Sequence, residues 1–160
     1  MHNDSYFLKQ SLKIAALSLH NGNLPFGCIL VDADGNIIKE GENTVVTENN
    51  AIAHCEINLV NKLTSLYTDG FLQTCTVYAS TEPCPMCAAA IFWSGIGRIV
   101  FALGKDKFHE TAGTTNPSHL LELSAEDVLS KGGRKTKVEG PLLEEEAINF
   151  YRNIYNSAPE

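Results

Sequence analysis

The sequence predicts an α/β protein built as a three-layer α-β-α sandwich. Segments with helical spacing of apolar residues alternate along the chain with short apolar or β-branched runs. This alternation is typical of a sheet that helices cover on both faces. The chain has 160 residues, no internal repeat and no linker, which suits one hydrophobic core better than two domains of normal size. We therefore expect a single domain over residues 1–160.

The helices are predicted from apolar residues spaced three or four positions apart, which places them on one face. In the first helix this stripe runs from Phe7 to Leu19, and we expect Asp4 or Ser5 to cap the N-terminus. In the third helix Pro85 occupies the first turn, where its missing N–H leaves no hydrogen bond unmade. The predicted helices cover residues 4–21, 53–66, 84–95 and 142–155.

The strands are predicted from short runs of apolar or β-branched residues bounded by turn residues. The first two runs are separated by "ADGN", in which the Asp34-Gly35 pair favours a hairpin. The segment 107–119 is rich in polar and turn-forming residues, and we expect a loop there. The predicted strands cover residues 26–32, 37–41, 75–80, 98–103 and 136–140.

Composition and charge exclude several classes of protein. The chain is 44% hydrophobic and 19% charged, and no apolar run approaches the ~18 residues of a membrane span. The formal charge of −7 disfavours a nucleic-acid partner, and the one basic cluster, "KGGRKTK", lies between acidic stretches. The N-terminal sequence lacks the basic and apolar regions of a signal peptide. We expect a cytoplasmic protein with reduced cysteines and no membrane association.

Two short motifs supply the residue types of a metal centre, "AHCE" at 53–56 and "PCPMC" at 83–87. Cys84 and Cys87 are three positions apart, so both sulfurs lie on one side of a helical turn. His54 opens the neighbouring predicted helix and supplies a third ligand. Three protein ligands leave the fourth position of a tetrahedral Zn²⁺ open, as catalytic sites require. The motifs therefore predict one catalytic Zn²⁺ per chain.

Glu56 is expected to act beside the metal without binding it. In this hypothesis a zinc hydroxide attacks a substrate ring carbon, while Glu56 moves protons to a ring nitrogen and to the departing amine. The order H-x-E…P-C-x-x-C is the pattern of zinc deaminases. Two other interpretations are a redox-active or buried CxxC, and a closed site with Cys55 as fourth ligand. We expect the Cys55 side chain to point elsewhere, and Cys28 and Cys75 to be small buried hydrophobes.

With these motifs the stretch "YASTEPCPMCAAAIFWSGIGRIVFAL" resembles the cytidine and deoxycytidylate deaminase superfamily. Within it, the sequence is most similar to the branch of guanine deaminases, yeast-type cytosine deaminase and tRNA adenosine deaminases, over residues 5–105. The resemblance implies a five-stranded mixed sheet and a homodimer. It also implies that His54, Cys84 and Cys87 bind zinc and that Glu56 is the proton shuttle.

The resemblance implies substrate contacts as well. Asn43 stands eleven residues before His54, the position of the substrate-binding asparagine in guanine deaminases. Phe26 lies in "PFG", whose phenylalanine walls the base pocket, and Cys55 replaces an alanine whose backbone amide faces the base. Alternatively, Asn43 forms an Asx turn and Phe26 packs in the core.

One segment departs from the guanine deaminases. They carry an acidic residue in a "GFDD"-like segment, where this chain has "TAGTTNP". Asp106 and Glu110 lie nearby and are candidates for a second proton shuttle, although each is also interpretable as an ordinary surface acid. The C-terminal part resembles a bacterial subgroup usually labelled nucleoside deaminase, a label that does not fix the substrate.

We expect hydrolytic deamination of a free aminated base, with guanine, converted to xanthine and ammonia, as the first candidate and a role in purine metabolism. The alternatives are adenosine-to-inosine deamination in tRNA and deamination of cytosine or a nucleoside. The tRNA reaction requires a phosphate-binding surface, which the acidic "PLLEEEA" does not offer. A non-catalytic zinc scaffold is a further alternative, but it would have no use for Glu56.

Overall fold

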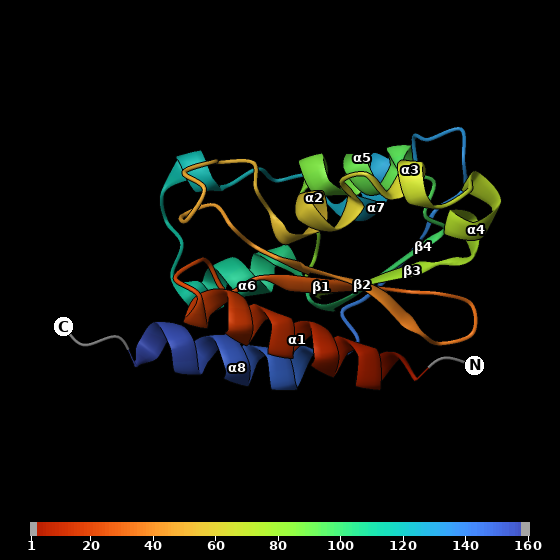
Figure 1. Cartoon of the computed structure of the whole chain (residues 1–160). Helices are drawn as coiled ribbons and strands as arrows, with labels where there is room; N and C mark the ends of the chain where they lie inside the picture. The colour runs from red at the N-terminus through yellow and green to blue at the C-terminus, as the bar shows by residue number, and fades with distance from the viewer. Residues whose placement is uncertain (1–2, 158–160) are drawn as a thin grey trace.

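The computed structural model describes residues 3–157, in which a five-stranded sheet separates two layers of helices (Figure 1). The strand order is β2-β1-β3-β4-β5, with β1 antiparallel to both neighbours and β3, β4 and β5 parallel. The predicted sandwich with a mixed sheet is therefore confirmed. The elements are α1 (Asp4–His20), β1 (Gly27–Val31), β2 (Ile37–Glu42), α2 (Cys55–Val60), α3 (Leu63–Leu66), α4 (Asp69–Thr74), β3 (Thr76–Thr81), α5 (Pro85–Trp93), β4 (Arg98–Leu103), α6 (Lys105–Ala112), the 3-10 helix η1 (Pro117–His119), α7 (Ala125–Leu129), β5 (Lys137–Glu139) and α8 (Glu144–Asn156).

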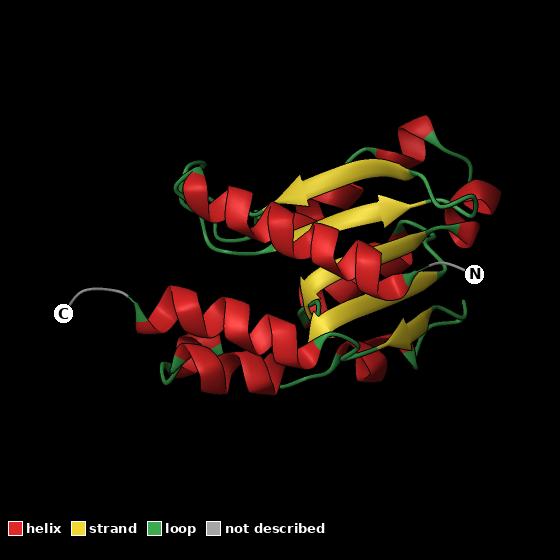
Figure 2. Cartoon of the chain, turned by 90° about the horizontal axis from the view of Figure 1, so that it is seen from below, coloured by secondary structure: helices red, strands yellow, loops and turns green. Residues whose placement is uncertain are grey.

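Each face of the sheet has its own hydrophobic core, because successive strand residues point to opposite faces. In β1, Cys28 and Leu30 pack toward α2, α5 and α7, while Ile29 and Val31 pack toward α1 and α8. Helices α1 and α8 lie over this second face (Figure 2). Because β1 and β3 are buried throughout, neither strand shows the alternation of apolar and charged residues that one solvent-exposed face would give. Within residues 3–157, no helix is both long and apolar enough to cross a membrane.

The N-cap of α1 was predicted one or two residues too late. The cap is Asn3, whose Oδ1 accepts a hydrogen bond from Tyr6 N at 3.1 Å. Asp4 does not cap the helix, because its carboxylate accepts hydrogen bonds from the guanidinium of Arg98, at 3.0 and 2.9 Å, and from the hydroxyl of Tyr78, at 2.6 Å. A contact with residues far away in the sequence thus decides the role of Asp4.

Two other predictions are corrected. The helix predicted over 53–66 is interrupted, because Lys62 adopts a left-handed conformation (φ 65°) between α2 and α3. The segment 107–119 was predicted to be a loop, but its first part, up to Ala112, belongs to helix α6. Gly113, with a φ of 68°, caps the C-terminus of this helix. A single buried aromatic, Phe108, anchors α6 against Phe26 and Tyr151. One aromatic in a polar segment gives no apolar periodicity, so the pattern missed this helix.

Gly27 is expected to be essential where α1 crosses β1. A Cβ atom there would lie 2.4 Å from Ala15 N and 2.7 Å from Ser11 O, so Gly27→Ala should push the helix off the strand. We expect a loss of about 1–3 kcal/mol in the free energy of unfolding, the usual cost of overpacking, measured by urea denaturation. Gly70→Ala is the control, because no atom lies within 4 Å of its added methyl; equal stability of the two variants would contradict this expectation.

Candidate active site

The two motifs meet because both open helices on the same face of the sheet. His54 is the N-cap of α2, and Cys84 is the N-cap of α5, with Pro85 as the first helical residue. The start of α2 is held close to β2 at Gly41, where an added Cβ would lie 2.4 Å from the carbonyl oxygen of Cys55. Both helices therefore direct their N-terminal ends, which carry partial positive charge, toward the same place.

The candidate metal ligands lie together with the spacing that zinc requires. His54 Nδ1 is 3.6 Å from Cys84 Sγ and 3.5 Å from Cys87 Sγ, and the three ligand atoms all lie within 4.8 Å of one another. Zn–S bonds of about 2.3 Å and Zn–N bonds of about 2.0 Å at a tetrahedral angle separate nitrogen from sulfur by about 3.5 Å. The residues present thus fit a zinc ion with three protein ligands.

The charges of the cluster also suit a cation. A hydrogen bond from the Cys87 thiol and the neighbouring His54 imidazole lower the pKa of Cys84 to about 4. The same thiolate raises the pKa of Cys87 and of His54. At neutral pH, Cys84 is therefore a thiolate already, which is the form that binds zinc.

Glu56 is placed next to this cluster but is not part of it. Its side chain is only 6% exposed, and burial raises the pKa of its carboxyl group. The neighbouring thiols of Cys55 and Cys87 act in the opposite direction and lower this pKa. Among the described residues, the group of mutually close ligand atoms contains His54, Cys84 and Cys87 and leaves Glu56 out. A carboxyl in this position is available for proton transfer rather than for metal binding.

The remaining cysteines belong to the core. Cys55 is 1% exposed and lies in one hydrophobic cluster with Cys28, and among the described residues it is outside the group of ligand atoms. Cys28 and Cys75 are fully buried in the same hydrophobic cluster, as predicted. The cysteine between His54 and Glu56 is thus a packing residue as far as its side chain is concerned.

Asn43 and Phe26 are joined through their backbones. Asn43 N donates to Phe26 O at 3.2 Å, and Asn43 Oδ1 accepts from Val45 N at 3.0 Å, which is the Asx turn considered above. Phe26 packs its ring against Phe108, at 5.1 Å between centroids. Asn43 is only 2% exposed. The alternatives considered from the sequence, a turn for Asn43 and core packing for Phe26, are both present, and neither excludes a contact with substrate.

The two acids considered as a second proton shuttle lie on the surface of α6. Asp106 is 89% exposed and pairs with Lys105 at 3.2 Å, and Glu110 is 69% exposed and pairs with Lys107 at 2.9 Å. Within the described chain, neither joins the group around His54. The structure therefore brings together the metal ligands and Glu56 but not these two acids.

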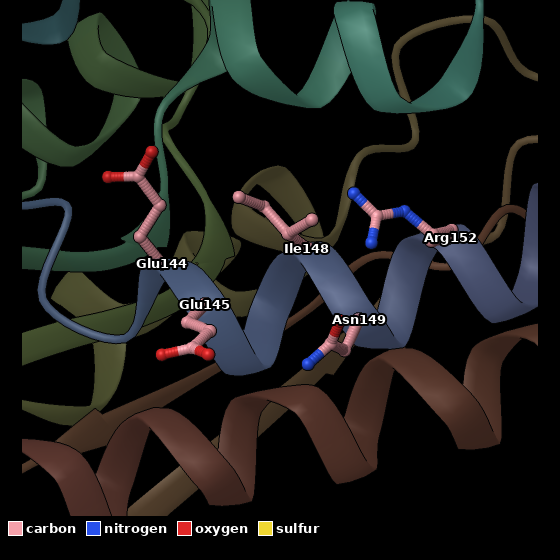
Figure 3. A pocket seen from close by; sticks show the side chains of 5 residues that line it. All are labelled: Glu144, Glu145, Ile148, Asn149 and Arg152. Carbon is pink, nitrogen blue, oxygen red and sulfur yellow. The ribbon is translucent and has the colours of Figure 1, made fainter.

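Two surface cavities lie apart from the metal ligands. One, of about 440 Å³, runs along α8 and is lined by residues such as Glu144, Ile148 and Arg152 (Figure 3). The other, of about 510 Å³, lies where β3, β4 and β5 end, beside Glu82 and Lys105. Neither is lined by His54, Glu56, Cys84 or Cys87.

Sequence reasoning missed the polar side chains that hold the loop leading to His54. Ser18 Oγ contacts Asn43 O at 2.9 Å, and Asn23 Oδ1 accepts hydrogen bonds from Val46 N and Thr47 N at 3.2 and 2.9 Å. The only signal in the sequence was a polar residue within or just after an apolar helical stripe.

Comparison with known families decides the identity of this metal centre. Residues 1–103 match the sequence model described as "Cytidine and deoxycytidylate deaminase zinc-binding region". The chain belongs to this deaminase family. Its members are zinc-dependent hydrolases that act on nucleobases or nucleosides, so the protein is a zinc-dependent hydrolase with His54, Cys84 and Cys87 available to the metal.

Three relatives represent different substrate classes within the deaminase family. The chain is 35% identical to a Schizosaccharomyces pombe protein named "Probable cytosine deaminase", over 96% of this chain and 93% of that one. It is 38% identical to the guanine deaminase of Bacillus subtilis, over 62% and 64% of the two chains. It is 27% identical to a tRNA-specific adenosine deaminase of Streptococcus pyogenes, over 100% and 94%.

Solved structures support the same family. The guanine deaminase of Bacillus subtilis superposes with a TM-score of 0.62 at 30% identity, covering 99% of this chain and 97% of that one. A variant of the protein NE0047 in complex with 8-azaguanine superposes with a TM-score of 0.77 at 25% identity, covering 96% and 85%. Deaminases of guanine, cytosine and tRNA adenosine are thus all similar to this chain.

Proposed function

We propose that the protein hydrolyses the amino group from a free aminated nucleobase, and that guanine, giving xanthine and ammonia, is its first substrate candidate. The observation that carries the proposal is a three-ligand His54, Cys84 and Cys87 group with the buried Glu56 beside it but outside it. The 38% identity to a guanine deaminase and the likeness to a structure holding 8-azaguanine support the choice of base.

In this reaction a C–N bond to the exocyclic amine breaks and a C=O bond forms with oxygen from water. Zinc, when bound, supplies a Lewis acid that makes this water nucleophilic. Glu56 takes a proton from the water and gives it to a ring nitrogen. It then takes the remaining proton of the added hydroxyl and gives it to the amine, which leaves as ammonia while the C=O bond forms. Burial raises the pKa of Glu56, which makes its carboxylate a stronger base than an exposed one. Asn43 and the backbone N–H of Cys55 are proposed to hold the base, with Phe26 against its ring.

Deamination of adenosine in tRNA is the second candidate, because the 27% identity to such an enzyme extends over 100% of this chain. A formal charge of −7 weighs against it, since phosphate binding depends on basic side chains. The three acids Glu144, Glu145 and Glu146 in the first turn of α8 add negative charge to the surface. Cytosine is the third candidate, on the 35% identity to the Schizosaccharomyces pombe protein.

An ammonia-release screen with zinc-loaded protein tests the proposal. The panel contains guanine, cytosine, isocytosine, adenine and their nucleosides, pterins, aminotriazines and an anticodon stem-loop transcript assayed for inosine. We expect the highest kcat/KM with guanine. Inosine formation faster than any release from free bases would replace the proposal with the tRNA reaction, and no release from any compound would refute it.

We also infer that the active form is a homodimer that pairs through the outer face of α5. Residues Pro85–Trp93 include no charged side chain, and Trp93 at the end of this helix is 79% exposed. A helix that is apolar all round is typically buried on all sides. An uncharged face also avoids the repulsion that two chains of charge −7 would otherwise meet.

Trp93→Glu is expected to convert the dimer to a monomer, because it places a charge in the apolar contact. Light scattering after size-exclusion chromatography should give twice the chain mass of 17.5 kDa for the wild type and 17.5 kDa for the variant. Leu121→Glu is the control, since Leu121 is also exposed, at 66%, but lies outside α5. A dimer in both variants would exclude this face.

A further inference from the structure

The loop 43–53 connects the end of β2 to the start of α2 and carries both Asn43 and the approach to His54. Its ends are brought together by a backbone hydrogen bond from Thr44 N to Ala53 O at 3.0 Å. The position of Asn43 relative to His54 therefore depends on how firmly this loop is closed.

One side chain bridges the two ends of this loop. Asn58 Nδ2 donates to Glu42 O and to Thr44 Oγ1, each at 2.8 Å, and lies 3.5 Å from Ala53 O. Its backbone N–H donates to His54 O at 3.0 Å. Asn58 thus contacts the end of β2, the residue after Asn43 and the residue before His54.

We propose that Asn58 is a positioning residue that fixes Asn43 relative to His54 by clamping the loop 43–53. The proposal rests on the proposed roles of Asn43 and His54 in substrate and metal binding. The groups facing Nδ2 are the hydroxyl of Thr44 and the carbonyl oxygens of Glu42 and Ala53. The carbonyl oxygens are acceptors only, so the clamp needs a side chain with N–H donors of this length. An aspartate has the same shape but brings an acceptor against these acceptors.

The rest of the loop is held independently of Asn58. Ser18 contacts Asn43 O, and Asn23 accepts hydrogen bonds from the backbone of Val46 and Thr47. Asn58→Asp should therefore loosen the ends of the loop without unfolding the protein. This separates a positioning effect from a general loss of structure.

The test compares Asn58→Asp with wild type in three measurements. We expect about one zinc per chain in both, and faster hydrogen–deuterium exchange at the amides of Thr44 and Val45 in the variant. With the best substrate of the screen, we expect kcat/KM to fall at least about tenfold, mostly through a higher KM. A merely structural role would lower the fraction of active protein and leave KM unchanged.

Asn61→Asp is the matched control, because Asn61 is an exposed asparagine at the C-cap of the same helix. It should keep wild-type exchange and KM. Combining Asn58→Asp with Thr44→Val should cost less than the sum of the two, since the residues contact each other. Unchanged KM, or loop exchange equal to that of Asn61→Asp, would overturn the proposal. If wild type deaminates nothing, the proposed function fails, while loop exchange still decides whether Asn58 clamps the loop.

Discussion

Replacing Glu56 by glutamine is expected to lower kcat by about 10²–10⁴-fold, or about 3–5 kcal/mol of activation free energy. Glutamine has the same shape but cannot carry a proton from water to the ring and the amine. Glu56 lies outside the group of His54, Cys84 and Cys87, so the variant should keep about one zinc per chain. Steady-state ammonia release and elemental analysis of the same preparation give both quantities.

Stability provides an internal check on this variant. Burial raises the pKa of Glu56, so burying its charged form costs free energy that a neutral amide avoids. Glu56→Gln should therefore unfold at the same or a higher temperature than wild type. Glu48→Gln, at an exposed position, is the control with wild-type kcat. A Glu56→Gln enzyme that turns over at the wild-type rate would show that another group transfers the protons.

The ligand set could be predicted from the sequence because its geometry is local. Cys84 and Cys87 occupy one turn of a helix, so their spacing alone places both sulfurs together. The start of that helix was also readable, because Pro85 is favoured in the first turn. That His54 reaches them, 3.5 Å from Cys87 Sγ, depends on α2 and α5 packing side by side, which the alternation of strands and helices implied.

Features that depend on single long-range contacts could not be predicted. Asn3 caps α1 because Arg98 engages Asp4, and these two residues are 94 positions apart. Helix α6 exists because Phe108 meets Phe26 and Tyr151. No local pattern records such pairings, since the free energy comes from tertiary burial rather than from helix propensity.

The clamp around Asn58 was missed for a related reason. An asparagine in an amphipathic helix is ordinarily a solvated residue, and only the folded structure shows the oxygens of Glu42 and Thr44 facing it. Asn43 poses the same difficulty, because its Asx turn to Val45 is compatible with substrate binding or with turn formation alone. Sequence spacing identifies the groups that do chemistry more readily than the groups that hold them in place.

Replacing Cys87 by serine is expected to abolish zinc binding and to reduce activity below about 1% of wild type, because a neutral hydroxyl is a poor zinc ligand. Cys87 is fully buried, and its Sγ lies 3.5 Å from His54 Nδ1. Among the described residues the ligand group consists of His54, Cys84 and Cys87, so the variant keeps only two of these ligands. Elemental analysis after dialysis should give about one zinc per chain in wild type and almost none in the variant.

Thermal unfolding with and without EDTA separates metal loss from core damage. Zinc present at 1,000 times its Kd stabilises the folded state by about 4 kcal/mol, or about 10 °C in Tm for a chain of this size. EDTA should therefore lower the Tm of wild type and leave that of Cys87→Ser unchanged. Cys75→Ser is the matched control, because Cys75 is equally buried but outside the ligand group. It should have a lower Tm, keep its zinc and remain sensitive to EDTA; loss of zinc from this variant would mean that zinc depends on the core rather than on the ligand set.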